Sequence, residues 1–223
     1  MSETSFLQLI IKFKAIMLWA ISKRNTLIMN YSEECYYNKR ANSYFNTTVN
    51  ADVNALYDRF LRYVSKGAKI LDLGCGSGRD VKVFFDMGYN VDAIDGSEEL
   101  VRLASEYTGI QVKCMDFNQL NENSVYDAVW ACASLLHVTS QNLPNIMARI
   151  RRALKTSGVV YASFKHGDFE GVRGERYYTD MTSERFAEVL NKTGGFSIVE
   201  EWYSDDVRAG NNTVWYNVIL RKV

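Results

Sequence analysis

Short apolar runs and segments with helical spacing follow one another along most of the chain. The apolar runs predict buried strands at residues 70–73, 91–95, 110–115, 126–132 and 158–164. Between or before them, apolar residues recur at helical spacing over 51–64, 80–87, 100–107 and 143–154. Strands and helices that alternate in this way predict a doubly wound α/β fold with a mostly parallel sheet.

The last third of the chain predicts a different connection. Thr182 can cap a helix that contains Phe186 and Val189, and Gly194-Gly195 can end it. Two further strands, 197–203 and 213–220, are separated by a loop too short for a crossover helix, so the last strand should be antiparallel. The predicted sheet then has seven strands. Residues 165–182 are polar and rich in glycine, and their length predicts a lid or binding loop.

Three glycines follow the first predicted strand at every second position. Gly74, Gly76 and Gly78 let the backbone turn tightly and approach a ligand closely. The helix that begins after them offers unpaired N–H groups to that ligand. Two alternatives are a tight turn that binds nothing and a dinucleotide site, although the third glycine lies one position early for the usual dinucleotide fingerprint.

The glycine segment, read as Asp72-x-Gly74-x-Gly76-x-Gly78, resembles the first motif of the class I S-adenosylmethionine-dependent methyltransferases of small molecules. The resemblance extends from about residue 30 to the end of the chain and implies a Rossmann-like sheet with a reversed last strand. It also implies S-adenosylmethionine as cofactor, with the methionine end held by Asp72, Gly74, Cys75, Gly76 and Gly78.

The segment before the glycine motif resembles the Y-x-x-x-A-x-x-Y sequence of that family. It reads Tyr37, Ala41 and Tyr44 at the matching positions. In the family this segment forms a flap over the cofactor, which implies that Tyr37 and Tyr44 contact it. An ordinary amphipathic helix packed on the core is the alternative.

Two further strand ends carry acidic residues. Asp95-Gly96 ends the second strand, at the same edge of the sheet as the glycine loop, where a carboxylate can accept both hydroxyls of a ribose. Ser97 already serves as the helix cap that Asp95 might otherwise provide. Asp116-Phe117 ends the third strand, and the resemblance implies that these two residues bind the adenine. A short turn that begins at Asp116 is the alternative.

The chain contains two histidines, and both follow predicted strands at the active edge. The segment from Cys132 to Val138 resembles the family segment that closes over the sulfonium and reaches the acceptor. We therefore expect Cys132 to contact the cofactor and His137 to act as the catalytic base, the alternative being a structural hydrogen bond. His166, Arg176 and Tyr178 are predicted to bind the acceptor, unless they belong to a solvated loop. Glu175, Tyr177, Asp206 and Arg208 are weaker candidates of the same kind.

Composition narrows the choice of partners. The 223-residue chain has no net charge, so nothing attracts it globally to nucleic acid or to an anionic membrane. Pro144 is the one proline, which excludes the Asp/Asn-Pro-Pro-aromatic and Pro-Cys motifs of DNA methyltransferases. The four cysteines are scattered, which argues against a zinc site and a disulfide framework and predicts a reducing, cytoplasmic location.

Residues 1–28 differ from the rest of the chain. Their apolar run is interrupted by Lys12 and Lys14 and is too short and too charged to span a membrane. We expect residues 1–28 to be an amphipathic helix, a disordered extension, or the product of translation from an upstream start. The methyltransferase domain is then expected at 29–223.

The sequence thus predicts an S-adenosylmethionine-dependent methyltransferase that transfers a methyl group in line to a small-molecule acceptor, without a metal. A non-catalytic S-adenosylmethionine-binding regulator or partner protein is the alternative from another class. An NAD-linked oxidoreductase is a weaker alternative. No residue selects a particular acceptor or an oligomeric state.

Overall fold

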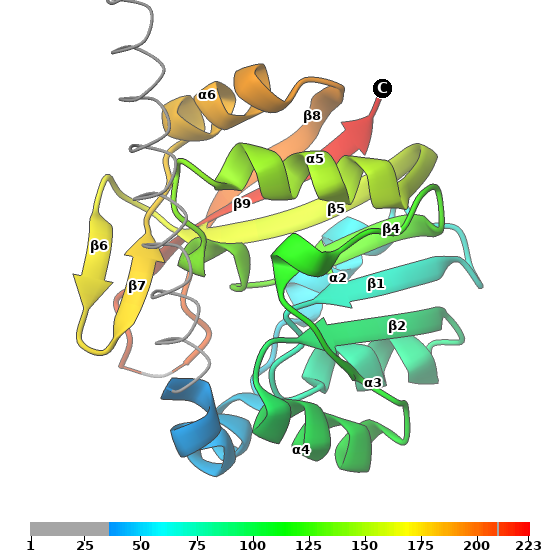
Figure 1. Cartoon of the computed structure of the whole chain (residues 1–223), viewed down its shortest axis with the longest axis vertical. Helices are drawn as coiled ribbons and strands as arrows, with labels where there is room; N and C mark the ends of the chain where they lie inside the picture. The colour runs from blue at the N-terminus through cyan, green and yellow to red at the C-terminus, as the bar shows by residue number, and fades with distance from the viewer. Residues whose placement is uncertain (1–35, 209) are drawn as a thin grey trace, which may run out of the picture.

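A seven-stranded sheet with the order β3-β2-β1-β4-β5-β9-β8 forms the centre of the molecule (Figure 1). The computed structural model describes residues 36–208 and 210–223. The strands are β1 (Lys69–Leu73), β2 (Asn90–Asp95), β3 (Lys113–Cys114), β4 (Tyr126–Ala131), β5 (Leu154–Lys165), β8 (Phe196–Asp205) and β9 (Val214–Lys222). Neighbours from β3 to β5 pair in parallel, whereas β9 pairs antiparallel with both β5 and β8. The predicted doubly wound sheet with a reversed last strand is therefore confirmed.

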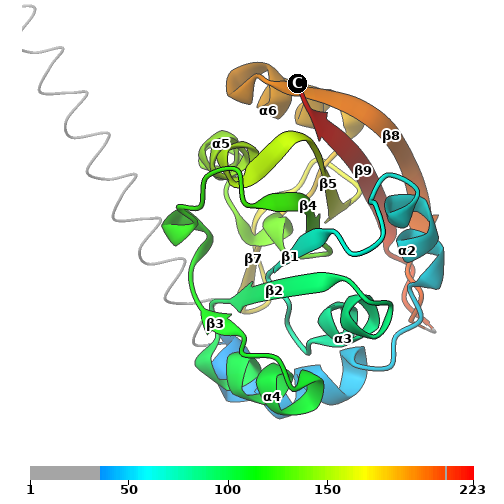
Figure 2. The same ribbon diagram turned by 90° about the vertical axis from the view of Figure 1, so that its right-hand side faces the viewer.

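Helices cover both faces of the sheet (Figure 2). They are α2 (Asn54–Leu61), α3 (Arg79–Asp86), α4 (Glu98–Thr108), α5 (Leu143–Ala153) and α6 (Ser183–Thr193), and residues 36–48 are also helical. Successive residues of β4 point to opposite faces, so Trp130 packs with Phe60 and Phe84 of α2 and α3. Val129 packs on the other face, with the apolar residues of α5 and α6. Both layers are dry, since Phe60, Phe84, Trp130 and Val129 are fully buried.

The structure differs from the sequence expectation in several elements. Residues 165–182 contain a hairpin, β6 (Glu170–Arg173) and β7 (Arg176–Thr179), where a loop was expected. The third strand has two residues where 110–115 was expected, because it forms the edge of the sheet and pairs with β2 only over Ile94–Asp95. Helix α2 is shorter than 51–64, because the chain enters turns after Leu61.

The carboxyl ends of β1, β2 and β4 meet at one edge of the sheet, and this edge positions the site. The backbone N–H groups of Gly74 and Cys75 both donate to the carbonyl of Ile94, at 2.9 and 3.0 Å, which ties the glycine loop to the end of β2. Short helices follow β3 and β4, namely η1 (Phe117–Gln119) and η2 (Leu135–His137). Figure 1 shows the β6–β7 hairpin beyond these carboxyl ends, near the helical residues 36–48.

The predicted extension, residues 1–28, lies outside the described residues, as do residues 29–35 of the predicted domain. Within residues 36–208 and 210–223, none of the helices has the length and hydrophobicity needed to cross a membrane.

Candidate cofactor and acceptor site

The glycine loop after β1 needs glycine for two different reasons. Gly74, Gly76 and Gly78 have φ angles of +83°, +54° and +76°, a region that side chains disfavour. A Cβ on Gly74 would lie 2.6 Å from the Cβ of Ser134, so glycine at this position lets the loop and Ser134 lie close together without a clash. A Cβ on Gly78 would instead lie 2.9 Å from Thr108 and 3.0 Å from Ala104. The absence of this Cβ therefore lets the loop pack on α4. Gly78 thus has a packing role and lies outside the cavity walls described next.

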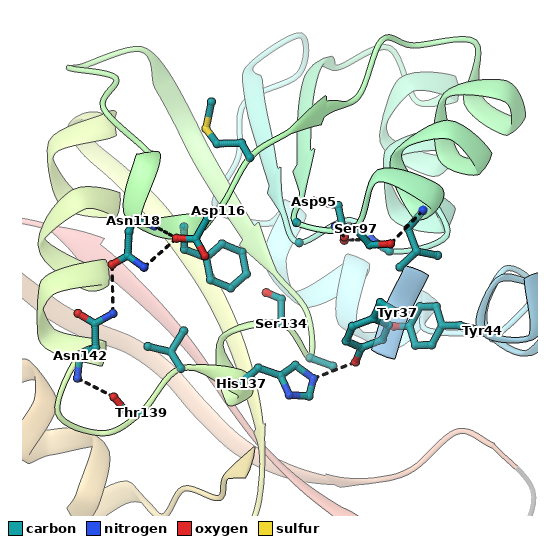
Figure 3. A pocket seen from close by; sticks show the side chains of 18 residues that line it. Tyr37, Tyr44, Asp95, Ser97, Asp116, Asn118, Ser134, His137, Thr139 and Asn142 are labelled. Atoms are coloured by element: carbon teal, nitrogen blue, oxygen red, sulfur yellow. Dashed lines mark hydrogen bonds between the residues drawn. The ribbon is translucent and has the colours of Figure 1, made fainter. Parts of the chain in front are cut away.

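A first cavity lies over the glycine loop, between the ends of β1, β2, β3 and β4 (Figure 3). The predicted cofactor residues that line it are Tyr37, Tyr44, Gly74, Gly76, Asp95, Gly96, Asp116 and Phe117. Sequence reasoning missed other lining residues, among them Met115, Asn118, Ser134 and Asn142. These four residues follow strands β3 and β4 and form no sequence motif. Only the order of the strands in the sheet shows that they line one cavity.

Asp95 is held in place by the backbone around it. Its Oδ2 accepts a hydrogen bond from the N–H of Gly76 at 2.8 Å, and its Oδ1 accepts one from the N–H of Ser97 at 2.9 Å. Burial raises the pKa of Asp95, and these backbone donors partly oppose that rise. Each carboxylate oxygen keeps a further lone pair, so Asp95 can still accept hydroxyl groups from a ligand in the cavity.

Asp116 caps the turn after β3 and also lines the cavity. Its Oδ1 accepts hydrogen bonds from the backbone N–H and the side-chain amide of Asn118, at 2.6 and 2.7 Å (Figure 3). The ring of the next residue, Phe117, lies 3.2 Å from the position of a Cβ on Gly74. The two alternatives for Asp116, a turn residue or a ligand-binding one, are therefore compatible.

Two buried polar atoms beside the loop have no hydrogen-bond partner in the described structure, the Oγ of Ser134 and the Oδ2 of Asp72. Ser134 lines the first cavity. Asp72 lies outside both cavity walls, and burial together with the nearby Asp80 raises its pKa. A ligand with a polar end over the glycine loop would satisfy the Ser134 hydroxyl, so the cavity fits a nucleoside cofactor.

A second cavity adjoins the first beneath the β6–β7 hairpin. The two cavities share Tyr37, Tyr44, Gly74, Ala133 and His137. The second also takes in predicted residues from distant parts of the chain: Cys75, Cys132, Arg176, Tyr178, Asp206 and Arg208. Most residues predicted for the cofactor and most predicted for the acceptor thus line adjoining cavities, but Cys75 and Cys132, predicted for the cofactor, line only the second.

His166 is the exception among the predicted acceptor residues. It is exposed, lines neither cavity, and packs edge-on against Tyr203 with ring centroids 4.7 Å apart. Alternation along the end of β5 explains this, because Lys165 faces the second cavity and the next residue does not. Of the weaker candidates, Glu175 forms an exposed ion pair with Arg40, and the Tyr177 hydroxyl donates to Glu170.

His137 lies on the wall shared by the two cavities, with hydrogen bonds at both ring nitrogens. Nδ1 lies 2.7 Å from the carbonyl oxygen of Tyr177, which can only accept, so Nδ1 carries the hydrogen. Nε2 therefore accepts the hydroxyl of Tyr37, at 2.9 Å (Figure 3). Burial lowers the pKa of His137 to about 4. The ring is thus neutral at pH 7, and it connects the helical residues 36–48 with β7.

A buried polar cluster beneath the second cavity was missed by sequence reasoning. Asp80 accepts hydrogen bonds from the Tyr57 hydroxyl, from Trp130 Nε1 at 2.7 Å, and from Arg79 Nε at 2.5 Å. The pKa of Asp80 is lowered by Arg79 and by these hydrogen bonds, against the effect of burial. The cluster holds Arg79 in the cavity wall, 3.8 Å from the sulfur of Cys132.

The two cysteines of the site are neutral thiols. Burial raises the pKa of Cys132 to about 12 and the pKa of Cys75 well above its usual value, and nearby carboxylates add to both effects. Because the thiolate is the nucleophilic form of cysteine, these residues shape the cavity wall and do not act as nucleophiles at neutral pH.

Comparison with known proteins finds a family model that matches part of the chain. Residues 70–158 match the family model described as a methyltransferase domain. The N-terminal Xaa-Pro-Lys N-methyltransferase 1 of Rattus norvegicus is 28% identical over 50% of this chain and 56% of its own length. The ubiquinone biosynthesis O-methyltransferase of Rickettsia conorii is 24% identical over 60% of this chain and 47% of its own length. The aligned regions thus span about half the length of these curated relatives.

A solved structure extends the likeness over most of the fold. The 1,6-didemethyltoxoflavin-N1-methyltransferase of Burkholderia thailandensis, solved with 1,6-didemethyltoxoflavin and S-adenosylhomocysteine, superposes with a TM-score of 0.71. It covers 90% of each chain at 20% identity, which establishes likeness of fold. By its family match over residues 70–158 and by its fold, this chain is thus similar to S-adenosylmethionine-dependent methyltransferases.

Proposed function

We propose that this protein transfers a methyl group from S-adenosylmethionine to a small-molecule acceptor, with the cofactor in the first cavity and the acceptor in the second. The observation that carries the proposal is the wall shared by the two cavities, formed by the glycine loop, Tyr37, Tyr44 and His137. Because the two cavities adjoin at these residues, a donor in one and an acceptor in the other can approach each other in line. A reducing, cytoplasmic setting is part of the proposal, supported by the scattered cysteines.

The side chains of the first cavity divide the binding of the cofactor. Asp95 would accept the ribose hydroxyls, Asp116 and Phe117 would contact the adenine, and the Ser134 hydroxyl would meet the polar methionine end over Gly74. The bound cofactor supplies a methyl group already activated by its sulfonium, so the protein contributes alignment and exclusion of water. The rings of Tyr37 and Tyr44, whose centroids lie 5.1 Å apart, exclude water at the shared wall.

His137 can serve the reaction in one of two ways, and both belong to the proposal. Nε2 could take a proton from the acceptor, but only after the Tyr37 hydroxyl has left that nitrogen. With a pKa of about 4, the ring is a weak base at neutral pH. The hydrogen bonds in place favour the other role, in which His137 positions Tyr37 and the hairpin.

A small acceptor is favoured over a protein because the second cavity lies beneath the hairpin. Glu175 in the hairpin turn forms an ion pair with Arg40, which joins the hairpin to the helical residues 36–48, with nitrogen and oxygen 2.5 Å apart. The Burkholderia enzyme, whose name gives a small heterocycle as substrate, aligns over the same extent of chain. The rat relative, named for methylation of a protein terminus, keeps a peptide acceptor as the competing hypothesis.

Calorimetry with S-adenosylmethionine tests the cofactor assignment. Because Asp95→Ala removes the ribose acceptor, we expect its affinity to fall at least about tenfold. Asp86→Ala, which removes an exposed carboxylate of α3, serves as the matched control and should bind like the wild type. Equal affinities in the wild type and the Asp95 variant would remove the ribose assignment.

Release of S-adenosylhomocysteine tests the reaction itself. The protein is incubated with S-adenosylmethionine and with either the small-molecule or the macromolecular fraction of a cell extract. We expect release with the small-molecule fraction. Release only with macromolecules would indicate a protein acceptor, and cofactor binding without release in either fraction would indicate a non-catalytic binding protein.

A further inference from the structure

The walls of the second cavity carry four cationic side chains, and two of them are neutralised locally. Arg79 pairs with the buried Asp80, with nitrogen and oxygen 2.5 Å apart. Arg208 pairs with Asp206 at 2.7 Å, and that carboxylate also accepts hydrogen bonds from Asn211 and Trp215. Neither carboxylate is therefore available to another cation or to a cationic ligand.

Lys165 and Arg176 are the two other cations of this wall, and within the described ranges neither has a carboxylate at salt-bridge distance. They come from different elements, the end of β5 and the start of β7, and converge on one ring. The Nζ of Lys165 lies 4.1 Å from the centroid of Tyr178, and the guanidinium carbon of Arg176 lies 5.2 Å from it. The fold thus brings two like charges close to one aromatic ring.

The surroundings make this pair of charges costly without an anion. Both side chains are partly buried. Burial and the neighbouring Arg173, Arg176 and Arg208 lower the pKa of Lys165, and Asp180 only partly opposes them. The remaining carboxylates of the cavity wall, Asp52 and Asp205, are exposed. Two converging cations with unused N–H groups are well suited to a carboxylate or phosphate, which an arginine can bind through two parallel hydrogen bonds.

We propose that the methyl acceptor carries an anionic group, a carboxylate or a phosphate, and that Lys165 and Arg176 bind it in the second cavity. This inference rests on the proposed function, because it assigns the second cavity to the acceptor. The anion would lie against the Tyr178 ring, between β5 and β7, and the rest of the acceptor would extend toward the wall shared with the first cavity. Lys165 and Arg176 are then residues that determine specificity, and they take no part in methyl transfer itself.

Binding of simple probes tests the proposal without knowledge of the natural acceptor. The probes are benzoate, phenyl phosphate and the neutral benzamide, measured by ligand-observed NMR with and without saturating S-adenosylhomocysteine. We expect at least one anion to bind about tenfold more tightly than benzamide, as for charge-assisted hydrogen bonds at a partly buried site. The tighter of the two anions identifies the group as carboxylate or phosphate.

Neutral variants assign that preference to the two residues. In Lys165→Gln and Arg176→Gln the preference should fall to within about twofold of benzamide. Lys82→Gln and Arg102→Gln carry the same substitutions at exposed ion pairs of α3 and α4 and should keep it. A preference retained in the Lys165 and Arg176 variants would overturn the proposal. So would equal binding of benzamide and the anions, or no binding of either anion at millimolar concentration.

Failure of the proposed function would give a different pattern. If S-adenosylhomocysteine does not bind, the cofactor assignment fails whatever the probes do. If it binds and the anion preference is absent, only the anionic acceptor is excluded.

Discussion

Each ring nitrogen of His137 accounts for one connection in the site. Nδ1 donates to the carbonyl of Tyr177 in β7, and Nε2 accepts the hydroxyl of Tyr37 in the helical residues 36–48. A protonated ring could no longer accept this hydrogen bond, because Nε2 would then carry a hydrogen and could only donate to the Tyr37 oxygen. The lowered pKa of His137 therefore favours the present direction of the bond between these two segments.

The pKa of His137 predicts how stability depends on pH. The folded pKa is about 4 and the unfolded value about 6.5, so the unfolded chain binds more protons between these pH values. The contribution is fully present above pH 6.5 and is lost as the pH falls toward 4. We expect the wild type to lose up to about 3 kcal/mol more of its unfolding free energy than His137→Gln between pH 7 and pH 4.

Urea unfolding at a series of pH values measures this difference. The raised pKa values of Asp72 and Asp95 act in the opposite direction, but they are present in both proteins and cancel in the comparison. Parallel profiles for the wild type and the variant would show that His137 is not held neutral by the fold.

At the scale of single residues, Gly74 and Asp95 line the first cavity, as expected for a turn or an acid at the carboxyl end of a parallel strand. The packing role of Gly78 depends on Ala104 and Thr108 of α4, which no motif connects to it. His166 lines neither cavity, because alternation at the end of β5 decides which of two neighbours faces the second cavity.

Among the elements, helix α3 carries two acidic residues that we expect to contribute very differently to the stability of the fold. Asp80, in its first turn, is buried and binds Arg79, Tyr57 and Trp130. Asp86, in its last turn, forms an exposed pair with Lys82. Removing one partner of a buried ion pair leaves a buried charge, whereas an exposed pair contributes little.

The two acids of α3 therefore predict different costs. We expect Asp80→Ala to lower the unfolding free energy by about 3–5 kcal/mol, because Arg79 would stay buried without its partner. Asp86→Ala should cost less than about 1 kcal/mol. Urea denaturation of both variants measures the two losses, and comparable losses would contradict the assignment of Asp80 as the centre of a buried cluster.

The β6–β7 hairpin was the element that the sequence described least well. Its strands contain charged and glycine residues, such as Glu170, Gly171 and Arg173, without an alternating apolar face. Its contacts with distant segments include the hydrogen bonds of Glu170 with Ser140 and of Tyr177 with His137, and the ion pair of Glu175 with Arg40. The local sequence pattern therefore predicted a loop. The convergence of Lys165 and Arg176 on Tyr178 could not be predicted from it.

For the molecule as a whole, β1, β2, β4 and β5 were predictable because each contains a compact apolar run, and the reversal of β9 was predictable because the loop before it is too short for a crossover helix. Trp130 and Val129, neighbours in β4, divide the interior into the two apolar layers that sandwich the sheet. The first cavity lies at the edge of this sheet, where segments far apart in the sequence meet. A ligand bound there should stabilise the entire fold.

Stabilisation by S-adenosylhomocysteine predicts a difference between two glycine variants. At about 100 times its Kd, the ligand should raise the unfolding free energy by about 2.7 kcal/mol in the wild type. Gly88→Ala, at a φ of +87° with nothing within 4 Å of a Cβ, should keep that gain. Gly74→Ala, at a φ of +83°, should lose most of it at the same ligand concentration, because its Cβ would meet Ser134.

Thermal unfolding with and without ligand measures the stabilisation in each variant. Because both glycines have a positive φ, alanine strains the backbone at both positions, and the two variants can be compared directly. Equal ligand-induced shifts in Gly74→Ala and Gly88→Ala would show that the approach to Ser134 is irrelevant to binding.

Tyr37 and Tyr44 belong to the walls of both cavities, so neither can move for one occupant without altering the space left to the other. Thermodynamic linkage then requires that each occupant changes the affinity of the other by the same factor. Order of addition in the steady-state kinetics, and trapping of one reactant by the other, would have their physical origin in these two aromatic rings.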